Sequence, residues 1–303
     1  MAGGVFLLIM EPLARGGEEP SLAFGGQALI EGVMIRSRSH LVMCIRQPGD
    51  GIMTHVEEVK SLSGRHRVLG LPFIRGVAAL FETLYMGVKG VHFSANAALE
   101  GEEEEFTYRE WALVAALTAA VSAFFFVVPF LLTSLLGLSG VLFNVVEALV
   151  RLAVFLAYIT LVSAWGEFRR ILQYHGAEHK AINALEAGAP LEVPTVRGFP
   201  RLHRRCGTSF IFIVMLVSIL LFSVMPAAGF AARLGYRLAL IPAIGAVSYE
   251  LLRLSGRHGD SAITRALTAP GLAFQRLTTR EPDDDMIEVA IRAVEEARRL
   301  SPP

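Results

Sequence analysis

One short stretch of the chain has residue types and a spacing that imply chemistry, the segment 174–180 with the sequence YHGAEHK. On a helix, His175 and His179 are one turn apart and project from the same face. Two imidazoles in this arrangement can bind one zinc ion, and Glu178 beside them could accept a proton from water bound to the metal. The order H-x-x-E-H inverts the H-E-x-x-H order of many metalloproteases. The stretch therefore predicts a site for zinc, or another divalent metal such as iron, with Glu178 as general base.

A metal needs at least one further protein ligand, because two histidines seldom fix a site alone. Cys206 is flanked by two arginines, which would lower the pKa of its thiol and favour a thiolate ligand. Glu250 lies in an apolar segment, where a carboxylate is costly and is by default a functional candidate. His203, three residues before Cys206, is a further candidate.

Each of these residues also has an ordinary structural interpretation. Glu250 could pair with a nearby arginine such as Arg253, and Cys206 could be a small buried apolar side chain. His203 could be a surface histidine beside arginines. The H-x-x-E-H segment itself could be a loop helix that faces water and binds no metal.

Composition indicates an integral membrane protein. Of the 303 residues, 53% are hydrophobic and 18% are charged, whereas soluble domains carry about 25% charged residues. The net charge of zero gives no argument for nucleic acid as a partner. The two cysteines, Cys44 and Cys206, are far apart and imply no disulfide framework, which fits a reducing, cytoplasm-facing setting.

Four segments satisfy the length of about 20 apolar residues that a membrane-spanning helix needs. They are residues 111–136, 144–165, 208–230 and 236–254. Basic residues are concentrated in the loop 166–207 and in the tail, and the turn between the first two segments has none. By the positive-inside rule, the H-x-x-E-H loop and both termini lie on the cytoplasmic side of the plasma (inner) membrane. The lipid bilayer is then the main partner, and loop arginines would contact anionic headgroups or an acidic substrate.

The region before the first span has a different character. Residues 40–59 predict a β-hairpin, and residues 27–35 predict a further strand, giving about three small strands. Between residues 72 and 93 the only charges are Arg75, Glu82 and Lys89, spaced by seven, so that on a helix they fall on one line. This amphipathic helix could lie in the membrane interface, pack on the spans, or be an ordinary buried helix of the cytoplasmic region.

The remaining segments predict linkers, docking helices and one ion pair. Residues 100–105 form an acidic run, which is typical of a solvated linker. Residues 262–277 form a second amphipathic helix, and three aspartates before residue 286 would cap a docking helix that ends near residue 300. Glu147 and Arg151, four residues apart, predict a structural ion pair.

The fold class expected is therefore a mainly α, polytopic membrane protein with a small N-terminal β-hairpin and amphipathic interfacial helices. Its expected divisions are a loose leader (1–20), a cytoplasmic hairpin and helix region (21–108), a first transmembrane hairpin (109–166), the cytoplasmic H-x-x-E-H loop (167–207), a second transmembrane hairpin (208–255) and a helical tail (256–303). A homo-oligomer is compatible with this organisation, although the sequence does not define the oligomeric state.

Four motifs together resemble the YqhQ-like family of bacterial multi-pass membrane proteins, whose function is unknown and which are regarded as metal-dependent enzymes. The motifs are residues 25–36, 174–186, 205–210 and 277–283, and the resemblance covers nearly everything after residue 20. It implies shared roles for Glu31, Arg36, His175, Glu178, His179, Cys206 and Glu250, but it brings no substrate. One expectation is that the N-terminal region folds over the metal loop and contributes Glu31 or Arg36; the alternative is a hairpin whose glycines serve tight turns.

The leading functional hypothesis is a metal-dependent hydrolase at the cytoplasmic face of the membrane, with zinc on His175 and His179 and with Cys206 or Glu250 completing the shell. The main alternative is a non-catalytic membrane scaffold or assembly factor with a closed structural metal site, to which His203 and Cys206 could both contribute. A transporter is less well supported, because the chain has no internal repeat and few charges within the spans.

Overall fold

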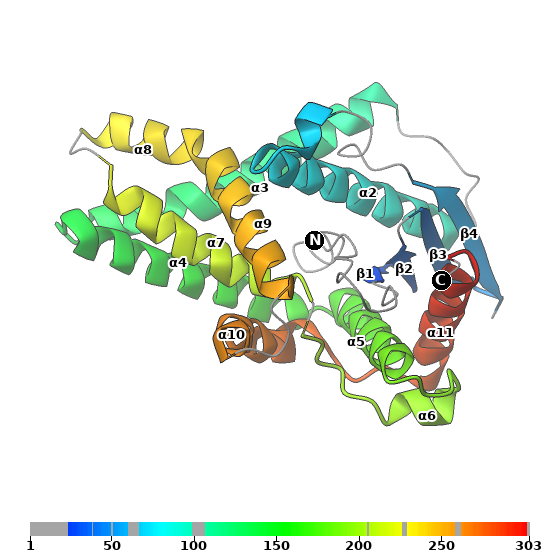
Figure 1. The fold of residues 1–303 in the computed structure, drawn as a ribbon. Helices are drawn as coiled ribbons and strands as arrows, with labels where there is room; N and C mark the ends of the chain where they lie inside the picture. Colours follow the sequence, from blue (N-terminus) through cyan, green and yellow to red (C-terminus); the bar gives the residue numbers. More distant parts are fainter. Residues whose placement is uncertain are drawn as a thin grey trace.

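The computed structural model describes residues 24–37, 39–49, 51–59, 67–98, 107–204, 206–225, 229–257 and 262–301. The expected leader (1–20) and acidic linker (100–105) lie outside these residues. The described part is mainly helical, with one antiparallel sheet near its start (Figure 1). A group of long apolar helices forms one end of the molecule, and the sheet with its covering helices forms the other.

The sheet has four strands in the order β1-β2-β3-β4: β1 (Gly25–Leu29), β2 (Gly32–Arg36), β3 (His40–Arg46) and β4 (Ile52–Glu58). The predicted hairpin is β3–β4 and is confirmed. The prediction of one strand over residues 27–35 is wrong, because a tight turn at Ile30 and Glu31 divides this run into β1 and β2, with Leu29 paired to Gly32. The two central residues of the turn are neither glycine, proline nor asparagine, although Gly32 follows them directly. Glu31 instead adopts a φ of +52°, an uncommon conformation for a residue with a side chain.

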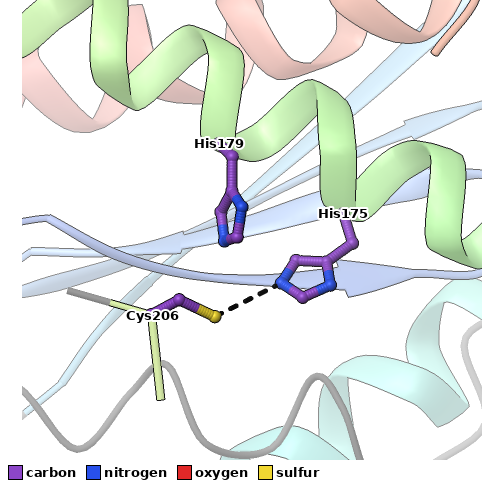
Figure 2. A group of neighbouring side chains, drawn as sticks. All are labelled: His175, His179 and Cys206. Atoms are coloured by element: carbon purple, nitrogen blue, oxygen red, sulfur yellow. Dashed lines mark hydrogen bonds between the residues drawn. The ribbon is translucent and has the colours of Figure 1, made fainter. Parts of the chain in front are cut away.

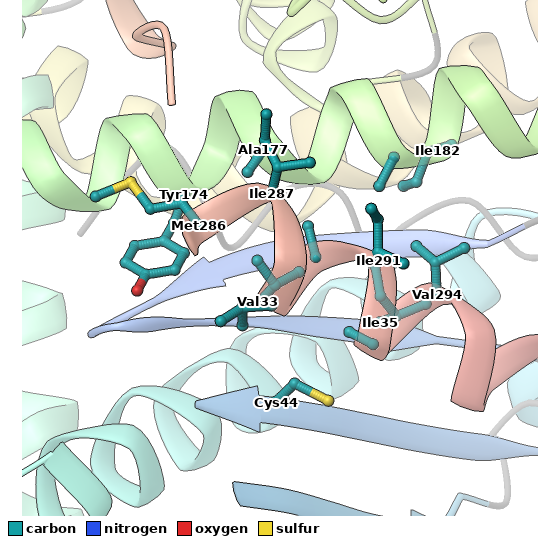
Figure 3. Packing of buried hydrophobic residues seen from close by; sticks show 14 of the residues in the cluster. Val33, Ile35, Cys44, Tyr174, Ala177, Ile182, Met286, Ile287, Ile291 and Val294 are labelled. Carbon is teal, nitrogen blue, oxygen red and sulfur yellow. The ribbon is translucent and has the colours of Figure 1, made fainter. Parts of the chain in front are cut away.

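One face of the sheet is covered by two helices that share a core with it. These are α5 (Gly166–Glu186) and α11 (Asp284–Arg299). Buried side chains of the core include Val33 and Ile35 from β2, Ala177 from α5, and Ile287 and Val294 from α11 (Figure 3). Helix α11 is the predicted docking helix, with Asp283 at its N-cap and two aspartates in its first turn, where negative charge stabilises a helix.

Helix α2 (Ile74–Ala98) is the predicted amphipathic helix, and it joins the sheet to the apolar helices. Its Met86 packs with Leu29, Met34, Leu41 and Met43 of the sheet. The three charges spaced by seven each pair with a different element: Arg75 with Glu250 of α9, Glu82 with Arg36 of β2, and Lys89 with Glu57 of β4. The line of charges is therefore the face by which α2 is held in place.

Two helices are long and apolar enough to cross a membrane: α3 (Tyr108–Ser134) and α4 (Gly140–Ser163). The pair α8 (Phe230–Ala239) and α9 (Ile241–Arg257) could form a third span, bent by 43°. Helix α7 (Thr208–Ser223) is apolar but shorter. The described residues thus give two or three candidate spans rather than a clear four. The predicted fourth span is divided because Pro242, in the first turn of α9, favours a new helix start.

Three short or peripheral helices complete the described structure. They are η2 (Arg67–Gly70), α6 (Val193–Arg197) and α10 (Ala262–Thr278). Helix α10 is the second amphipathic helix expected from the sequence, and it packs on α7 and α4. Its C-terminal end leads the chain from the apolar helices back to α5, where residues 278–280 meet the H-x-x-E-H segment.

Candidate metal centre

The H-x-x-E-H segment forms two turns of α5, and its polar residues point into the protein. Because His175, Glu178 and His179 are three and four residues apart, they share one helical face. All three are buried, with 2%, 0% and 0% of their surface exposed. The same helix supplies Tyr174 and Ala177 to the neighbouring core. The segment is therefore a buried helix rather than a loop helix that faces water.

Cys206 brings a third donor atom to the two histidines (Figure 2). One ligand atom from each of His175, His179 and Cys206 lies within 4.8 Å of the others. The Cys206 Sγ is 3.6 Å from Nε2 of His175, and the two imidazole centroids are 4.4 Å apart. Cys206 stands shortly before α7 (Thr208–Ser223), at the point where the chain leaves the segment after α6, passes α5 and enters the apolar helices.

Backbone carbonyls fix the orientation of both imidazoles. The Nδ1 atom of His175 lies 2.8 Å from the carbonyl oxygen of Thr278, and that of His179 lies 2.7 Å from the carbonyl oxygen of Arg201. A carbonyl oxygen can only accept, so each Nδ1 carries the proton and donates it. Each Nε2 atom is consequently an unprotonated lone-pair donor. Metal-binding histidines are typically oriented in this way by a partner on the other ring nitrogen.

Burial controls the protonation states of the site. It lowers the pKa of His175 to about 4 and that of His179 well below its ordinary value, so both rings are neutral, as metal ligation requires. It also raises the pKa of Glu178 well above the usual range. For Cys206, burial raises the thiol pKa to about 12, against the expectation that flanking arginines would lower it. The hydroxyl of Thr208 donates to the sulfur, and a bound metal would displace the thiol proton.

Several polar atoms at the centre have no partner within the described structure. Nε2 of His179 and both carboxyl oxygens of Glu178 are buried without a hydrogen bond. Leaving a buried polar group unsatisfied costs roughly 1–3 kcal/mol, and more where it is charged. A cation among these atoms would remove that cost. The combination of two neutral imidazoles, one thiol and an adjacent carboxyl fits zinc or iron by donor type.

Two glycines allow the polypeptide to close around the centre. A Cβ on Gly26 of β1 would lie 2.5 Å from the Glu178 carboxyl oxygen Oε1, so the strand passes directly over that side chain. A Cβ on Gly176 would collide with the carbonyl oxygen of Arg280. The first glycine lets the N-terminal sheet cover Glu178. The second lets residues 278–280 approach α5, which places the Thr278 carbonyl on His175.

The other candidate residues lie outside the His175, His179 and Cys206 group. Nε2 of His203 is 3.3 Å from Glu186, and its ring centroid is 5.6 Å from that of His179. Two guanidinium nitrogens of Arg75 donate to the carboxylate of Glu250, Nε at 2.6 Å and Nη2 at 2.5 Å, which accounts for the position of Glu250 without a metal.

Glu31 and Arg36 hold the N-terminal sheet in place. The guanidinium of Arg170 donates two hydrogen bonds to Glu31, and the hydroxyl of Tyr174 donates a third. Arg36 pairs with Glu82. The N-terminal region therefore does fold over the H-x-x-E-H segment, as expected, but the residue that lies against Glu178 is Gly26 rather than Glu31 or Arg36.

Sequence reasoning missed Gln275, a fully buried side chain of α10. Its Oε1 accepts from the backbone N–H of His203 at 2.8 Å, and its Nε2 donates to the His203 carbonyl at 2.9 Å. The amide thereby holds the segment that carries the Arg201 carbonyl and Cys206. No sequence signal sets this glutamine apart from the other polar residues near the end of α10, such as Thr278.

Comparison with known proteins supports a family but gives no activity. Residues 71–300 match the family model described as "Protein of unknown function (DUF1385)". The chain is 35% identical over 298 residues to "Uncharacterized protein YqhQ" of Bacillus subtilis (strain 168), covering 92% of this chain and 93% of that protein. No solved structure matches. The chain belongs to the DUF1385 family.

Proposed function

We propose that this member of the DUF1385 family is a membrane-embedded, metal-dependent hydrolase. The observation that carries the proposal is the convergence of His175, His179 and Cys206, with both Nε2 atoms available and with Nε2 of His179 buried and unpartnered among the described residues. In a protein without a metal, such an arrangement would leave unsatisfied polar atoms at no benefit.

His175 Nε2, His179 Nε2 and Cys206 Sγ would hold the metal. Three protein ligands of these types are typical of catalytic zinc sites, whereas structural sites are closed by four. When bound, the metal supplies a Lewis acid that polarises a carbonyl or phosphoryl oxygen and activates water.

Glu178 is the residue that would move protons. Its carboxyl lies on the same helical face as the histidines, and neither oxygen has a hydrogen-bond partner in the described part of the chain. The dry surroundings raise its pKa above the ordinary range of a carboxyl, a direction of shift that is common for catalytic acids and bases. The metal's positive charge would act in the opposite direction and favour the carboxylate. These two influences together would keep Glu178 able to take up and release a proton at Oε1 or Oε2.

The second candidate function is a membrane scaffold with a structural metal. It is favoured by the burial of all four side chains, since Cys206 is 1% exposed and Glu178 is fully buried. Here Glu178, which lies beside the group of His175, His179 and Cys206, would turn toward the metal as the fourth ligand and close the shell. The two functions thus differ in the role of one carboxyl group.

We further propose that α3, α4 and the α8–α9 pair cross the plasma membrane, with α7 as a shorter fourth crossing, and that α5 and both termini are cytoplasmic. The distribution of basic residues supports this orientation. The exposed apolar side chains Val77, Phe81 and Tyr85 of α2 would contact lipid, and Tyr85 stacks on Trp111 at the start of α3 with centroids 5.1 Å apart. Tyrosine and tryptophan are enriched at the level of the lipid headgroups.

The test is metal analysis of the full chain purified in a nonionic detergent. Wild type should hold about one zinc or iron per chain, and the His175→Ala/His179→Ala variant should lose it. His92→Gln is the matched control, because His92 lies on α2, outside the group of His175, His179 and Cys206, and this variant should retain the metal. A folded wild type that takes up no zinc even when zinc is added would refute both functions.

Glu178→Gln separates the two functions. In the hydrolase, the variant keeps stoichiometric metal but loses hydrolysis of model esters, phosphate esters or peptides by about 100-fold or more. In the scaffold, it loses metal affinity by a similar factor, because a ligand is gone. Wild-type activity that is insensitive to Glu178→Gln would rule out the catalytic role.

A further inference from the structure

A second polar cluster lies among the apolar helices, where α4, α7 and α8 meet. Its centre is Glu147 of α4, which pairs through Oε1 with Arg151 and through Oε2 with Arg237 of α8, both at 2.5 Å. The exposed fractions of Glu147, Arg151 and Arg237 are 1%, 8% and 3%. The ion pair of Glu147 and Arg151 predicted from the sequence is present, and the structure adds a second arginine to it.

The charges of this cluster do not balance. Guanidinium groups remain protonated in proteins, so Arg151 and Arg237 bring two positive charges to one carboxylate. Arg233, half-buried one turn before Arg237, adds a third positive charge nearby. In the part of the chain that the structure describes, Glu147 is the one carboxylate that pairs with Arg151 or Arg237. An uncompensated charge is costly among apolar helices, and such residues usually mark a binding site.

Aromatic rings enclose the cluster. The guanidinium carbon of Arg151 is 4.7 Å from the centroid of Phe126, and that of Arg237 is 4.5 Å from the centroid of Phe222. The guanidinium carbon of Arg233 lies 4.2 Å from the centroid of Phe143. Ring faces attract cations and offset part of their desolvation, but they carry no net charge.

Unused hydrogen-bond donors remain beside these rings. The Nε–H groups of Arg151 and Arg237 are buried and lack an acceptor in the described structure. Arg237 donates to Asn144 at 2.9 Å, and Arg151 donates to Ser218 at 3.5 Å, so neutral partners already satisfy other nitrogens. What the cluster lacks, among the described residues, is a second anionic acceptor besides Glu147.

The helical backbone is also interrupted beside the cluster, between α8 and α9. Arg237 lies in the last turn of α8, just before the 43° bend between α8 and α9. Discontinuous helices within a membrane domain commonly mark ligand sites. The cluster is separate from the metal centre, because Glu147 is about 24 Å along α4 from the helix end that leads into α5.

We propose that this cluster is a binding site for a phosphate-bearing anion. Arginines match the oxygens of a phosphate group through paired N–H donors, and one such anion would neutralise the excess positive charge. The surrounding phenylalanines would accept an apolar body attached to the phosphate, as in a membrane phospholipid. Free inorganic phosphate carries the same recognised group without that body.

The experiment measures the thermal stability of the full chain in a nonionic detergent. The probes are dioctanoyl-phosphatidylglycerol and inorganic phosphate, each titrated against chloride at equal ionic strength. Wild type should be stabilised by the lipid in a saturable manner. A response to inorganic phosphate as well would assign recognition to the phosphate alone, whereas a response to the lipid only would assign part of it to the aromatic walls.

Variants of opposite charge make the test specific. Arg237→Gln leaves Glu147 and Arg151 as a balanced pair and should weaken the affinity for the probe at least about tenfold, the scale of one lost charge-assisted hydrogen bond. Glu147→Gln adds one unit of uncompensated positive charge and should bind the probe more tightly. An ordinary structural ion-pair network predicts no gain from Glu147→Gln.

Arg233→Gln replaces Arg237→Gln in the binding test if the latter does not fold, because Arg233 is less buried than Arg237. It should weaken the affinity by a smaller factor. The proposal is overturned if neither probe stabilises wild type relative to chloride, or if wild type, Glu147→Gln and the arginine variant respond equally.

Discussion

The close contact between β1 and Glu178 makes Gly26→Ala a direct test of how the N-terminal sheet packs on the site. The added Cβ would lie 2.5, 2.6 and 2.8 Å from Oε1, Cδ and Cγ of Glu178. Glu178 is fully buried, so its side chain has no solvent into which it could move. Either the strand must lift from α5 or the carboxyl group must shift within the candidate metal centre.

Two opposing effects set the size of the change. Forcing one additional carbon into a packed interior costs about 1–3 kcal/mol. Replacing glycine by alanine at a backbone position that alanine tolerates gains about 0.4–1 kcal/mol, because the unfolded chain loses freedom. The steric cost wins, and the net loss in the free energy of unfolding should be about 1–2 kcal/mol. For a domain of this size that corresponds to a melting temperature lower by roughly 2–8 °C.

A double-mutant cycle attributes this loss to the Glu178 contact. Glu178→Asp withdraws the carboxyl group by one methylene, so Gly26→Ala should cost about 1 kcal/mol less in the Glu178→Asp background than in wild type. Gly49→Ala is the control, because a Cβ on Gly49 meets nothing within 4 Å and should leave the melting temperature unchanged or slightly raised. If Gly26→Ala melts like wild type, or if its effect adds to that of Glu178→Asp without coupling, the proposed packing of β1 on the site is wrong.

Three further predictions test electrostatics, topology and membrane contact. Hydrogen bonds from Arg170 lower the pKa of Glu31, so this carboxylate stabilises the fold above its ordinary pKa of 4.5 and the stabilisation is lost as the pH falls through the lowered folded-state pKa. Between about pH 6 and pH 3, the melting temperature of wild type should therefore fall by more than that of Glu31→Gln. Equal decreases in the two proteins would contradict the assignment. In intact cells, a membrane-impermeant maleimide should label Ser139→Cys but not Glu192→Cys, and the reverse pattern would invert the proposed topology. Brominated phospholipids should quench the fluorescence of the chain's two tryptophans in vesicles, and emission unchanged from that in unbrominated lipid would argue against spans at α3 and α4.

The sequence was most informative where local spacing determines geometry. The positions of His175, Glu178 and His179 on one face follow from helical periodicity alone. The heptad spacing of Arg75, Glu82 and Lys89 likewise identified one face of α2. Periodicity does not identify the partner across that face. For this reason Glu250 was a candidate ligand in the sequence, although the structure pairs it with Arg75.

Predictions failed where a tertiary environment overrides a local preference. The arginines beside Cys206 would lower the thiol pKa in water, but complete burial raises it to about 12. The two central residues of the β1–β2 turn have no strong turn preference, and contacts of Glu31 with Arg170 and Tyr174, far along the chain, hold the turn in place. The backbone carbonyls of Thr278 and Arg201 orient the two imidazoles. Every residue has a backbone carbonyl, so no sequence pattern could have identified these partners.

The burial of the centre limits which chemical states it can hold. In dry surroundings a neutral imidazole is favoured over imidazolium, a thiol over thiolate and a carboxyl over carboxylate, so without a cation every group at the centre tends to be uncharged. A divalent metal reverses that preference for Cys206 and Glu178, because its charge stabilises the anionic form of each. The thiolate has a place in either proposed function as a ligand. The carboxylate of Glu178 is a ligand only in the scaffold. In the hydrolase it must lie close enough to the metal for the positive charge to stabilise the anionic form, and it must still exchange a proton. The position of Glu178, three residues from His175 and under the backbone of Gly26, is therefore the feature on which the choice between catalysis and structure depends.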